Sequence, residues 1–204
     1  MKTLLVATTN SGKLAELRGF LSDLPLKLVS LADIGITDSV EETGVTFQEN
    51  AILKAKFYAQ KSGLATLADD GGMEIDALHG EPGVKSHRWV HWDKESSDED
   101  LIAFTFEKMQ GVPVGKRGAQ LRLVLAFVLP KGQVFTKEAK IHGIVPDKPS
   151  SVRHTGFPYR SILFIPEIHK YYDHEALTEE ESKTYNHRRR AIEELKPIIR
   201  TTLC

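Results

Sequence analysis

The chain has 204 residues, the length of one globular domain, and its composition leaves few broad classes of function open. Its 27 basic and 28 acidic residues give a formal net charge of -1, so it has no overall attraction for nucleic acid or an anionic membrane. No apolar stretch approaches the roughly 20 residues of a membrane helix, and the N-terminal apolar run is too short for a signal peptide. The one cysteine, Cys204, cannot form a disulfide within the chain. We therefore expect a cytoplasmic protein without a membrane or nucleic-acid partner, in which local groups hold any bound anion.

The first 70 residues alternate between short apolar runs and amphipathic stretches. Thr46 and Glu49 have the spacing of a capping box at the start of a helix. A short strand would place Asp69 and Asp70 at its end. The expected elements are a strand at 4–7, a helix at 12–21, a strand at 26–31, a helix from 46 to about 63 and a strand at 64–68.

The rest of the chain mixes strands and helices without strict alternation. Apolar residues alternate from Leu121 to Leu129, which predicts a strand with one buried face. A turn at 130–132 leads to a partner strand near 134–145. A helix is expected at 98–109, and a last helix from Thr178, bent or shortened by Pro197. This order predicts an α/β fold with a mixed sheet in one domain spanning residues 1–204. A second lobe near 101–145 would leave a cleft between two lobes.

The turn 8-TTNSGK-13 follows the first strand and consists of small polar residues, a glycine and a lysine. A strand–turn–helix unit points backbone N–H groups and the positive end of the helix dipole at an anion, and Lys13 adds a charge for a phosphate oxygen. The turn lacks the two-glycine frame of a Walker loop. Taken alone, it fits a simple helix cap at Asn10 and a solvated Lys13 equally well.

The segment 69-DDGG-72 places two adjacent carboxylates after an apolar run. One of them could hold Mg²⁺, which binds through one or two carboxylates and substrate phosphates, or could take a proton from an attacking water. Glycines would allow a ligand to approach the backbone closely. Because Asp-Gly is common in turns, a simple turn is the alternative interpretation.

Further candidates lie in three other segments. Glu42 precedes the helix that begins near residue 46, and Lys54 lies two turns into it. The run 186-NHRRR-190 offers donors to a phosphate or a base carbonyl, although such a run is usually a solvated helix face. Phe157 could stack on an aromatic base, although buried aromatics more often belong to a core. The eight histidines lack the spacing of a zinc site.

In their order along the chain, these segments resemble the inosine/xanthosine triphosphate pyrophosphatase family, the house-cleaning enzymes for non-standard purine nucleotides. The family's T-x-N-x-x-K turn is matched by residues 8–13, and its E-x-G-x-T-F-x-E-N-A-x-x-K-A segment by 42-ETGVTFQENAILKA-55. Its most specific block is matched by 68-ADDGGMEIDALHGEPGVKSHR-88, and its histidine–arginine pair by His187 and Arg188. The resemblance covers nearly the whole chain.

The resemblance implies an elongated mixed β-sheet with flanking helices that form two lobes around a nucleotide cleft, usually in a homodimer. The implied reaction is Mg²⁺-dependent attack of water on a nucleoside triphosphate such as ITP, dITP or XTP. Its products are the monophosphate and pyrophosphate.

The family's functional residues carry over onto matching positions of this chain. Asp70 would activate the water and, with Glu42, hold Mg²⁺, while Lys54 would bind phosphate. His187 and Arg188 would contact the base, where donors favour a 6-oxo purine. The full set of substrate-binding candidates is Thr8, Thr9, Asn10, Ser11, Gly12, Lys13, Lys54, Gly71, Phe157, Arg160, Lys183, His187 and Arg188.

The chain departs from the family pattern mainly on the side of the base. The G-F-G-Y-D-P segment becomes 156-GFPYRS-161, in which Arg160 replaces an acid. The family's lysine five residues before the histidine is Ser182, and Lys183 lies one residue late, a rotation of about 100° on a helix. Gly71 replaces a serine. We therefore expect pyrophosphohydrolase chemistry to survive, with the preferred base left open.

Two other functions remain to be weighed. A related pyrophosphatase for modified pyrimidine or methylated nucleotides, like the septum-formation-inhibitor class, fits the altered 157–161 segment but not the retained histidine–arginine pair. A nucleotide sensor without turnover would have little need of Glu42, Asp69 and Asp70. For a dimer, an exposed apolar patch around Trp89 and Trp92 is one candidate surface.

Overall fold

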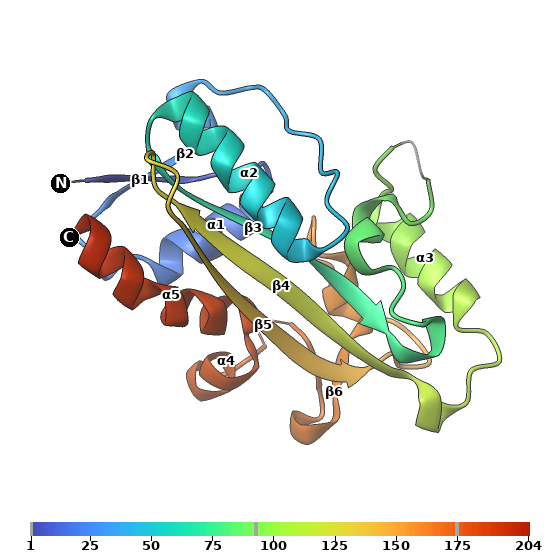
Figure 1. The fold of residues 1–204 in the computed structure, drawn as a ribbon. Helices are drawn as coiled ribbons and strands as arrows, with labels where there is room; N and C mark the ends of the chain where they lie inside the picture. Colours follow the sequence, from blue (N-terminus) through green and yellow to red (C-terminus); the bar gives the residue numbers. More distant parts are fainter. Residues whose placement is uncertain (1, 92–93, 174–175) are drawn as a thin grey trace. The chain divides into compact units, whose positions relative to one another are not determined.

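The structure, a computed structural model, describes residues 2–91, 94–173 and 176–204 and confirms the α/β class, with helices flanking a seven-stranded mixed sheet (Figure 1). The strand order is β2-β1-β3-β4-β5-β6-β7. Strand β1 is parallel to β2 and β3, whereas β6 is antiparallel to β5 and β7. The strands are β1 (Thr3–Val6), β2 (Lys27–Ser30), β3 (Ala65–Ile75), β4 (Gly118–Val128), β5 (Val134–Ile144), β6 (Phe164–Ile165) and β7 (Lys170–Tyr171). The α-helices are α1 (Ser11–Phe20), α2 (Phe47–Ser62), α3 (Asp98–Lys108), α4 (Glu179–Tyr185) and α5 (His187–Leu203).

The chain divides into two compact units, and β3, β4 and β5 contribute to both. The first unit comprises the residues up to Asp70, 123–139 and 188–204, and the second comprises 71–122 and 140–187. The second unit is therefore not the 101–145 segment that the sequence suggested. The difference arises because β4 and β5 are long strands of 11 residues each, and part of each belongs to the first unit.

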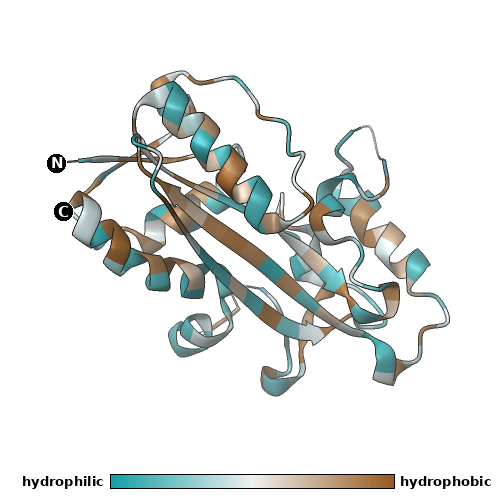
Figure 2. Ribbon diagram, in the orientation of Figure 1, coloured by the Kyte–Doolittle hydropathy of each residue, from teal (hydrophilic) through white to brown (hydrophobic). Residues whose placement is uncertain are grey.

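The core of the first unit lies between the sheet and helices α1 and α5, which Figure 1 shows on the face opposite α2. Leu123, Leu125 and Phe127 of β4 pack in this core with leucines and isoleucines of the two helices. The intervening residues of β4 are also buried, so the prediction of one buried face is wrong for residues 123–128. Figure 2 shows the resulting succession of apolar residues along β4. A strand covered by helices on both faces loses its alternation.

Helix α2 begins with the predicted capping box. Thr46 accepts a hydrogen bond from the backbone N–H of Glu49, whose carboxylate accepts one from the N–H of Thr46. Ala51 and Ala55 lie fully buried along its inner face, where small side chains permit a close approach to the sheet. The helix ends at Gly63, whose φ of 68° is a left-handed conformation that suits glycine.

Two element boundaries differ from the sequence prediction. Strand β3 does not end at the aspartate pair but continues through 69-DDGG-72 to Ile75, so this segment is not a turn. The expected single C-terminal helix is two helices separated at Asn186, which has an extended conformation (φ -79°, ψ 100°). Helix α5 includes Pro197 and still continues to Leu203.

The second unit has its own core, formed by residues of β3, α3, β4 and the 158–165 segment. Met73, Leu101 and Tyr172 are among its fully buried members. Trp89 is 5% exposed and packs edge-on against Phe104, so it does not supply the exposed patch suggested for a dimer. Trp92 lies outside the described residues. Within the described part of the chain, no helix combines the length and apolar character needed to cross a bilayer.

Candidate active site

Strand β3 directs its two central carboxylates to opposite faces of the sheet. Successive side chains of a strand alternate in direction, and Asp69 and Asp70 are consecutive in β3. Asp70 therefore meets side chains of α2, whereas Asp69 meets those of α1 and α5. Both carboxylates are buried.

Asp70 belongs to a cluster in which two carboxylates share one ammonium group. The Nζ atom of Lys54 lies 3.3 Å from Oδ1 of Asp70 and 3.2 Å from Oε1 of Glu42. Asn50 donates a hydrogen bond from Nδ2 to Oδ2 of Asp70 at 3.2 Å. Because Asn50 and Lys54 are four residues apart on α2, they lie on the same face of the helix. The structure thus brings together Glu42, Lys54 and Asp70.

The loop before α2 is held by the same asparagine. The backbone N–H of Gly44 donates to Oδ1 of Asn50 at 2.7 Å. A Cβ atom at residue 44 would lie 2.6 Å from this oxygen, so the position requires glycine. Asn50 therefore links the loop that carries Glu42 to Asp70.

Burial and charge shift the acid–base behaviour of this cluster. Burial, with the neighbouring carboxylate of Glu42, raises the pKa of Asp70 to about 6, although Lys54, Lys13 and Asn50 act in the opposite direction. Burial alone would lower the pKa of Lys54, but Asp70, Glu42 and Asp69 raise it above its ordinary value. At neutral pH the cluster therefore holds a charged Lys54 beside an ionised Asp70. A carboxylate with a pKa near 6 is suited to accept a proton near neutral pH.

Asp69 lies in a second ionic cluster on the other face. Its Oδ2 atom is 3.2 Å from Nζ of Lys13 and 3.1 Å from Nη2 of Arg188, and Nη1 of Arg188 is 2.6 Å from Oε2 of Glu16. Burial alone would raise the pKa of Asp69, but Lys13, Arg188 and Lys54 hold it well below its ordinary value. Asp69 is thus permanently ionised in the folded protein at neutral pH.

The turn before α1 has the predicted strand–turn–helix geometry. Asn10 is the N-cap residue, and its Oδ1 atom accepts a hydrogen bond from the backbone N–H of Lys13 at 2.9 Å. Thr8 accepts one from the backbone N–H of Asn10 through its hydroxyl at 3.2 Å. Thr9 and Ser11 are exposed, and Gly12 is half-buried. The helix N-terminus and the Lys13 ammonium therefore belong to one short segment, as an anion site requires.

The second unit contains the aromatic candidates. The guanidinium of Arg160 lies 3.8 Å from the ring centre of Phe157 and 5.5 Å from that of Tyr172. The hydroxyl of Tyr172 is 2.7 Å from Nδ1 of His187. Arg160 is only 3% exposed, and His187 is also buried. These four residues form a continuous group of rings and donors.

The remaining candidates lie apart from these groups. Lys183 on α4 has a side chain that is 52% exposed and pairs with Glu180 at 2.8 Å. Gly71 follows Asp70 in β3 and is half-buried. Arg188, expected at the base, instead pairs with Glu16 and Asp69. The roles of all three in substrate binding stay predictions.

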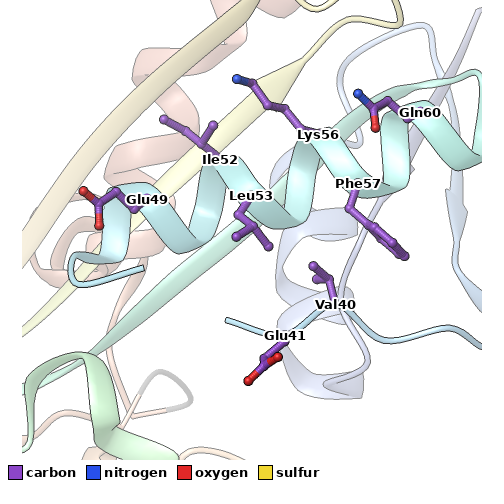
Figure 3. A pocket seen from close by; sticks show the side chains of 8 residues that line it. All are labelled: Val40, Glu41, Glu49, Ile52, Leu53, Lys56, Phe57 and Gln60. Atoms are coloured by element: carbon purple, nitrogen blue, oxygen red, sulfur yellow. The ribbon is translucent and has the colours of Figure 1, made fainter. Parts of the chain in front are cut away.

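A hollow of about 670 Å³ lies on the outer side of α2, and Figure 3 shows the side chains that line it. Ile52, Leu53, Phe57 and Val40 make it largely apolar, and Lys56 is the one cationic side chain among the described residues that line it. Triphosphate binding needs several positive groups, so the ionic clusters, not this hollow, define the candidate site.

Glu42 and Asp70 are the residues best placed to hold a metal ion. An oxygen of each lies within 3.3 Å of the same Lys54 ammonium, and carboxylate oxygens are the protein ligands that Mg²⁺ prefers. Among residues 2–91, 94–173 and 176–204, no group of three or more His, Cys, Asp or Glu side chains gathers at one point. Two carboxylates suit Mg²⁺, which completes its coordination with waters and substrate phosphates.

Comparison with known proteins places this geometry in a family. The family model described as the Ham1 family matches residues 4–198. The chain belongs to the Ham1 family. A dITP/XTP pyrophosphatase of Yersinia pseudotuberculosis is 37% identical over 204 residues, covering 98% of this chain and 99% of the relative. One of the same name from Geobacter sulfurreducens is 40% identical over 167 residues, covering 82% of each chain.

Solved structures of Ham1 proteins share the fold. A HAM1 protein from Coxiella burnetii superposes with a TM-score of 0.83 at 31% identity and covers 98% of both chains. A nucleoside-triphosphatase / dITP/XTP pyrophosphatase from Mycobacterium abscessus has a TM-score of 0.73 at 34% identity, covering 96% of this chain and 99% of the other. The family resemblance inferred from the sequence is therefore confirmed.

Three residues of the ionic and aromatic groups were not among the sequence candidates. Asn50 lies within the 42–55 segment that matches the family. Because it is uncharged, the sequence alone did not mark it as a site residue. Glu16 lies three residues after Lys13 on α1, a spacing that places both on one helix face. Tyr172 gave no local signal, because its partners are distant in sequence.

Proposed function

We propose that this member of the Ham1 family hydrolyses non-standard purine nucleoside triphosphates such as ITP, dITP and XTP to the monophosphate and pyrophosphate. Its similarity to dITP/XTP pyrophosphatases supports this activity. The observation that carries the proposal is the convergence of Glu42 and Asp70 on one cationic position, with Lys13 and the N-terminus of α1 in the same unit.

Asp70 is the proposed general base. Its pKa of about 6 leaves it ionised at neutral pH, and its proton affinity is higher than that of an ordinary aspartate. A water oxygen would form a bond to the α-phosphorus while the bond to the pyrophosphate oxygen breaks. The water proton passes to Asp70, and pyrophosphate leaves with the bonding electron pair.

We propose Mg²⁺ as the cofactor, held by Glu42 and Asp70. When bound, it would supply charge neutralisation for the triphosphate and the developing negative charge. Asn50 would hold Glu42 and Asp70 in a fixed relative position, because it is hydrogen-bonded both to the loop that carries Glu42 and to Asp70. Lys54 would then move its ammonium from the two carboxylates to a phosphate oxygen.

Phosphate would be bound by Lys13, Lys54 and the backbone N–H groups at the start of α1. The base would contact Phe157 and His187, and Arg160 would fix the orientation of the Phe157 ring through their cation–π contact. Because Arg160 occupies the position of an acid in the family pattern, we expect the rank order of ITP, dITP and XTP to differ from that of relatives that carry the acid.

We further propose that the protein acts as a homodimer in the cytoplasm, where free nucleotides are found. The apolar hollow on α2 supports a pairing of two copies (Figure 3). Antiparallel packing of two α2 helices centred between Ile52 and Leu53 would place Glu49 of one copy opposite Lys56 of the other, so the charges are self-complementary. Sedimentation velocity should report a dimer for the wild type and a monomer for Leu53→Arg; a wild-type monomer at micromolar concentration would contradict the pairing.

The activity is tested by pyrophosphate and orthophosphate release with Mg²⁺ from ITP, dITP, XTP, GTP, ATP and modified pyrimidine triphosphates. Pyrophosphate from the first three is expected, and Asp70→Asn should remove it. Asp23→Asn is the matched control, because Asp23 pairs with Lys196 on the surface. Release from modified pyrimidines alone would indicate the related pyrophosphatase activity. Tight binding without release would indicate a sensor.

A further inference from the structure

Four charged side chains form an alternating row on the face of the sheet opposite α2. The order is Glu16, Arg188, Asp69 and Lys13, joined by contacts of 2.6, 3.1 and 3.2 Å. Their side chains are 8%, 5%, 2% and 14% exposed, respectively. Since solvent screens such a row poorly, a change of charge at one end alters the balance of contacts along it.

The amino-acid sequence at the start of α5 gives a physical reason for the ion pair between Arg188 and Glu16. The first turn of α5 contains no acidic residue and begins His187-Arg188-Arg189-Arg190. Positive side chains are unfavourable at a helix N-terminus because the backbone dipole is positive there. Glu16 on α1 and Asp69 on β3 supply the missing negative charge to Arg188 from outside the helix.

Asp69 divides one oxygen between two cations. Its Oδ2 atom contacts both Arg188 and Lys13. The ammonium of Lys13 has three donors, so it can remain paired with Asp69 and still donate hydrogen bonds to a phosphate. How firmly Asp69 holds Lys13 depends on how much of Arg188 is already neutralised by Glu16.

We propose that Glu16 is a positioning residue for phosphate binding, which acts through Arg188 and Asp69 to hold Lys13 in place. The inference rests on the proposed function, because it assigns Lys13 to the triphosphate. Without the charge of Glu16, the guanidinium of Arg188 turns both of its terminal nitrogens towards Asp69. A bidentate Arg–carboxylate pair then draws Asp69 away from Lys13, which loses its anchor.

The test compares steady-state kinetics of dITP hydrolysis for Glu16→Gln, Lys13→Met and the double variant. Glu16→Gln should raise KM about tenfold and change kcat less than about twofold, within the usual range of coupling between sites. In the Lys13→Met background, the same change should have no further effect on KM. Glu194→Gln on α5 is the matched control, since Glu194 forms a surface pair with Lys137 at 3.5 Å, and it should behave as wild type.

The outcomes separate this role from a purely structural one. An equal rise in KM in both backgrounds, a fall in KM, or a loss of kcat at unchanged KM would each overturn the proposal. If Glu16→Gln does not fold, Glu16→Asp is used instead, because aspartate keeps the negative charge but is shorter by one methylene. The KM of Glu16→Asp should rise about threefold. An unchanged KM would count against the proposal. Absence of dITP turnover in the wild type would instead refute the proposed function.

Discussion

Replacing Asp70 by asparagine is expected to abolish turnover and, at the same time, to raise the stability of the folded protein relative to wild type as the pH increases from about 4 to about 6. Burial and the charge of Glu42 raise the pKa of Asp70 to about 6, above the ordinary value of about 4 for an aspartate. A carboxyl group whose pKa is raised by folding binds its proton more tightly in the folded state. It therefore destabilises the fold progressively as the pH rises from about 4 to about 6, and fully above that range.

The magnitude follows from this difference in pKa. About 2 pKa units correspond to about 3 kcal/mol of unfolding free energy at pH 8, and the cost disappears only below about pH 3, where both states are protonated. Asparagine is neutral at every pH and removes this cost. The single side-chain oxygen of asparagine can accept a hydrogen bond from Lys54 or from Asn50 but not from both. The free-energy cost of the lost hydrogen bond is the same at all pH values.

The assay is urea unfolding of wild type and Asp70→Asn at a series of pH values without Mg²⁺. The stability of the variant relative to wild type should increase by about 3 kcal/mol between about pH 3 and pH 8, whatever the offset from the lost hydrogen bond. Asp69 contributes in the opposite sense, because its pKa is lowered, but its contribution is common to both proteins. A pH-independent difference, or one that decreases with pH, would refute the assignment of a raised pKa to Asp70.

The remaining predictions concern the metal, the loop before α2 and the pH profile. Mg²⁺ at 100 times its dissociation constant should stabilise the wild type by about 2.7 kcal/mol but not Glu42→Gln, and equal thermal shifts for both would place the metal elsewhere. Gly44→Ala, whose Cβ would lie 2.6 Å from Oδ1 of Asn50, should displace the Glu42 loop, and we expect kcat/KM for dITP to fall about tenfold; unchanged kinetics would show that the loop adapts. The kcat/KM of the wild type should fall as the pH is lowered and Asp70 takes up a proton, and a flat profile down to about pH 4 would exclude Asp70 as the base.

Much of the fold follows from local patterns in the sequence. The capping box at Thr46 and Glu49 marks the start of α2, because both partners of a cap lie within one turn of helix. The strand–turn–helix unit that contains Asn10 follows from one apolar run and one polar cluster. In such cases short-range contacts decide the conformation, and the sequence displays them directly.

The boundaries that depend on tertiary contacts were not predictable in this way. The segment 69-DDGG-72 has the composition of a turn, yet it is the middle of β3, because Asp69 and Asp70 find cationic partners on both faces of the sheet. The buried run 123–128 in β4 likewise reflects helices on both faces. An isolated sequence shows neither the partner charges nor the covering helices.

The candidate site was predictable as a set of residues but not as a network. The family segments named Glu42, Lys54 and Asp70, and the structure adds that one ammonium lies between the two carboxylates. The row from Glu16 to Lys13 joins residues more than 100 positions apart, as the contact of Arg188 with Asp69 spans 119 positions. No periodicity or spacing in the sequence encodes such a contact.

The central claim, that this site directs water at the α-phosphorus of a non-standard purine triphosphate, is tested most directly by hydrolysing dITP in H₂¹⁸O with Mg²⁺ and locating the label by mass spectrometry. We predict ¹⁸O in the deoxynucleoside monophosphate and none in the pyrophosphate. Label in the pyrophosphate would place the attack on the β-phosphorus, and labelled orthophosphate would indicate a different phosphohydrolase; either result would contradict the account.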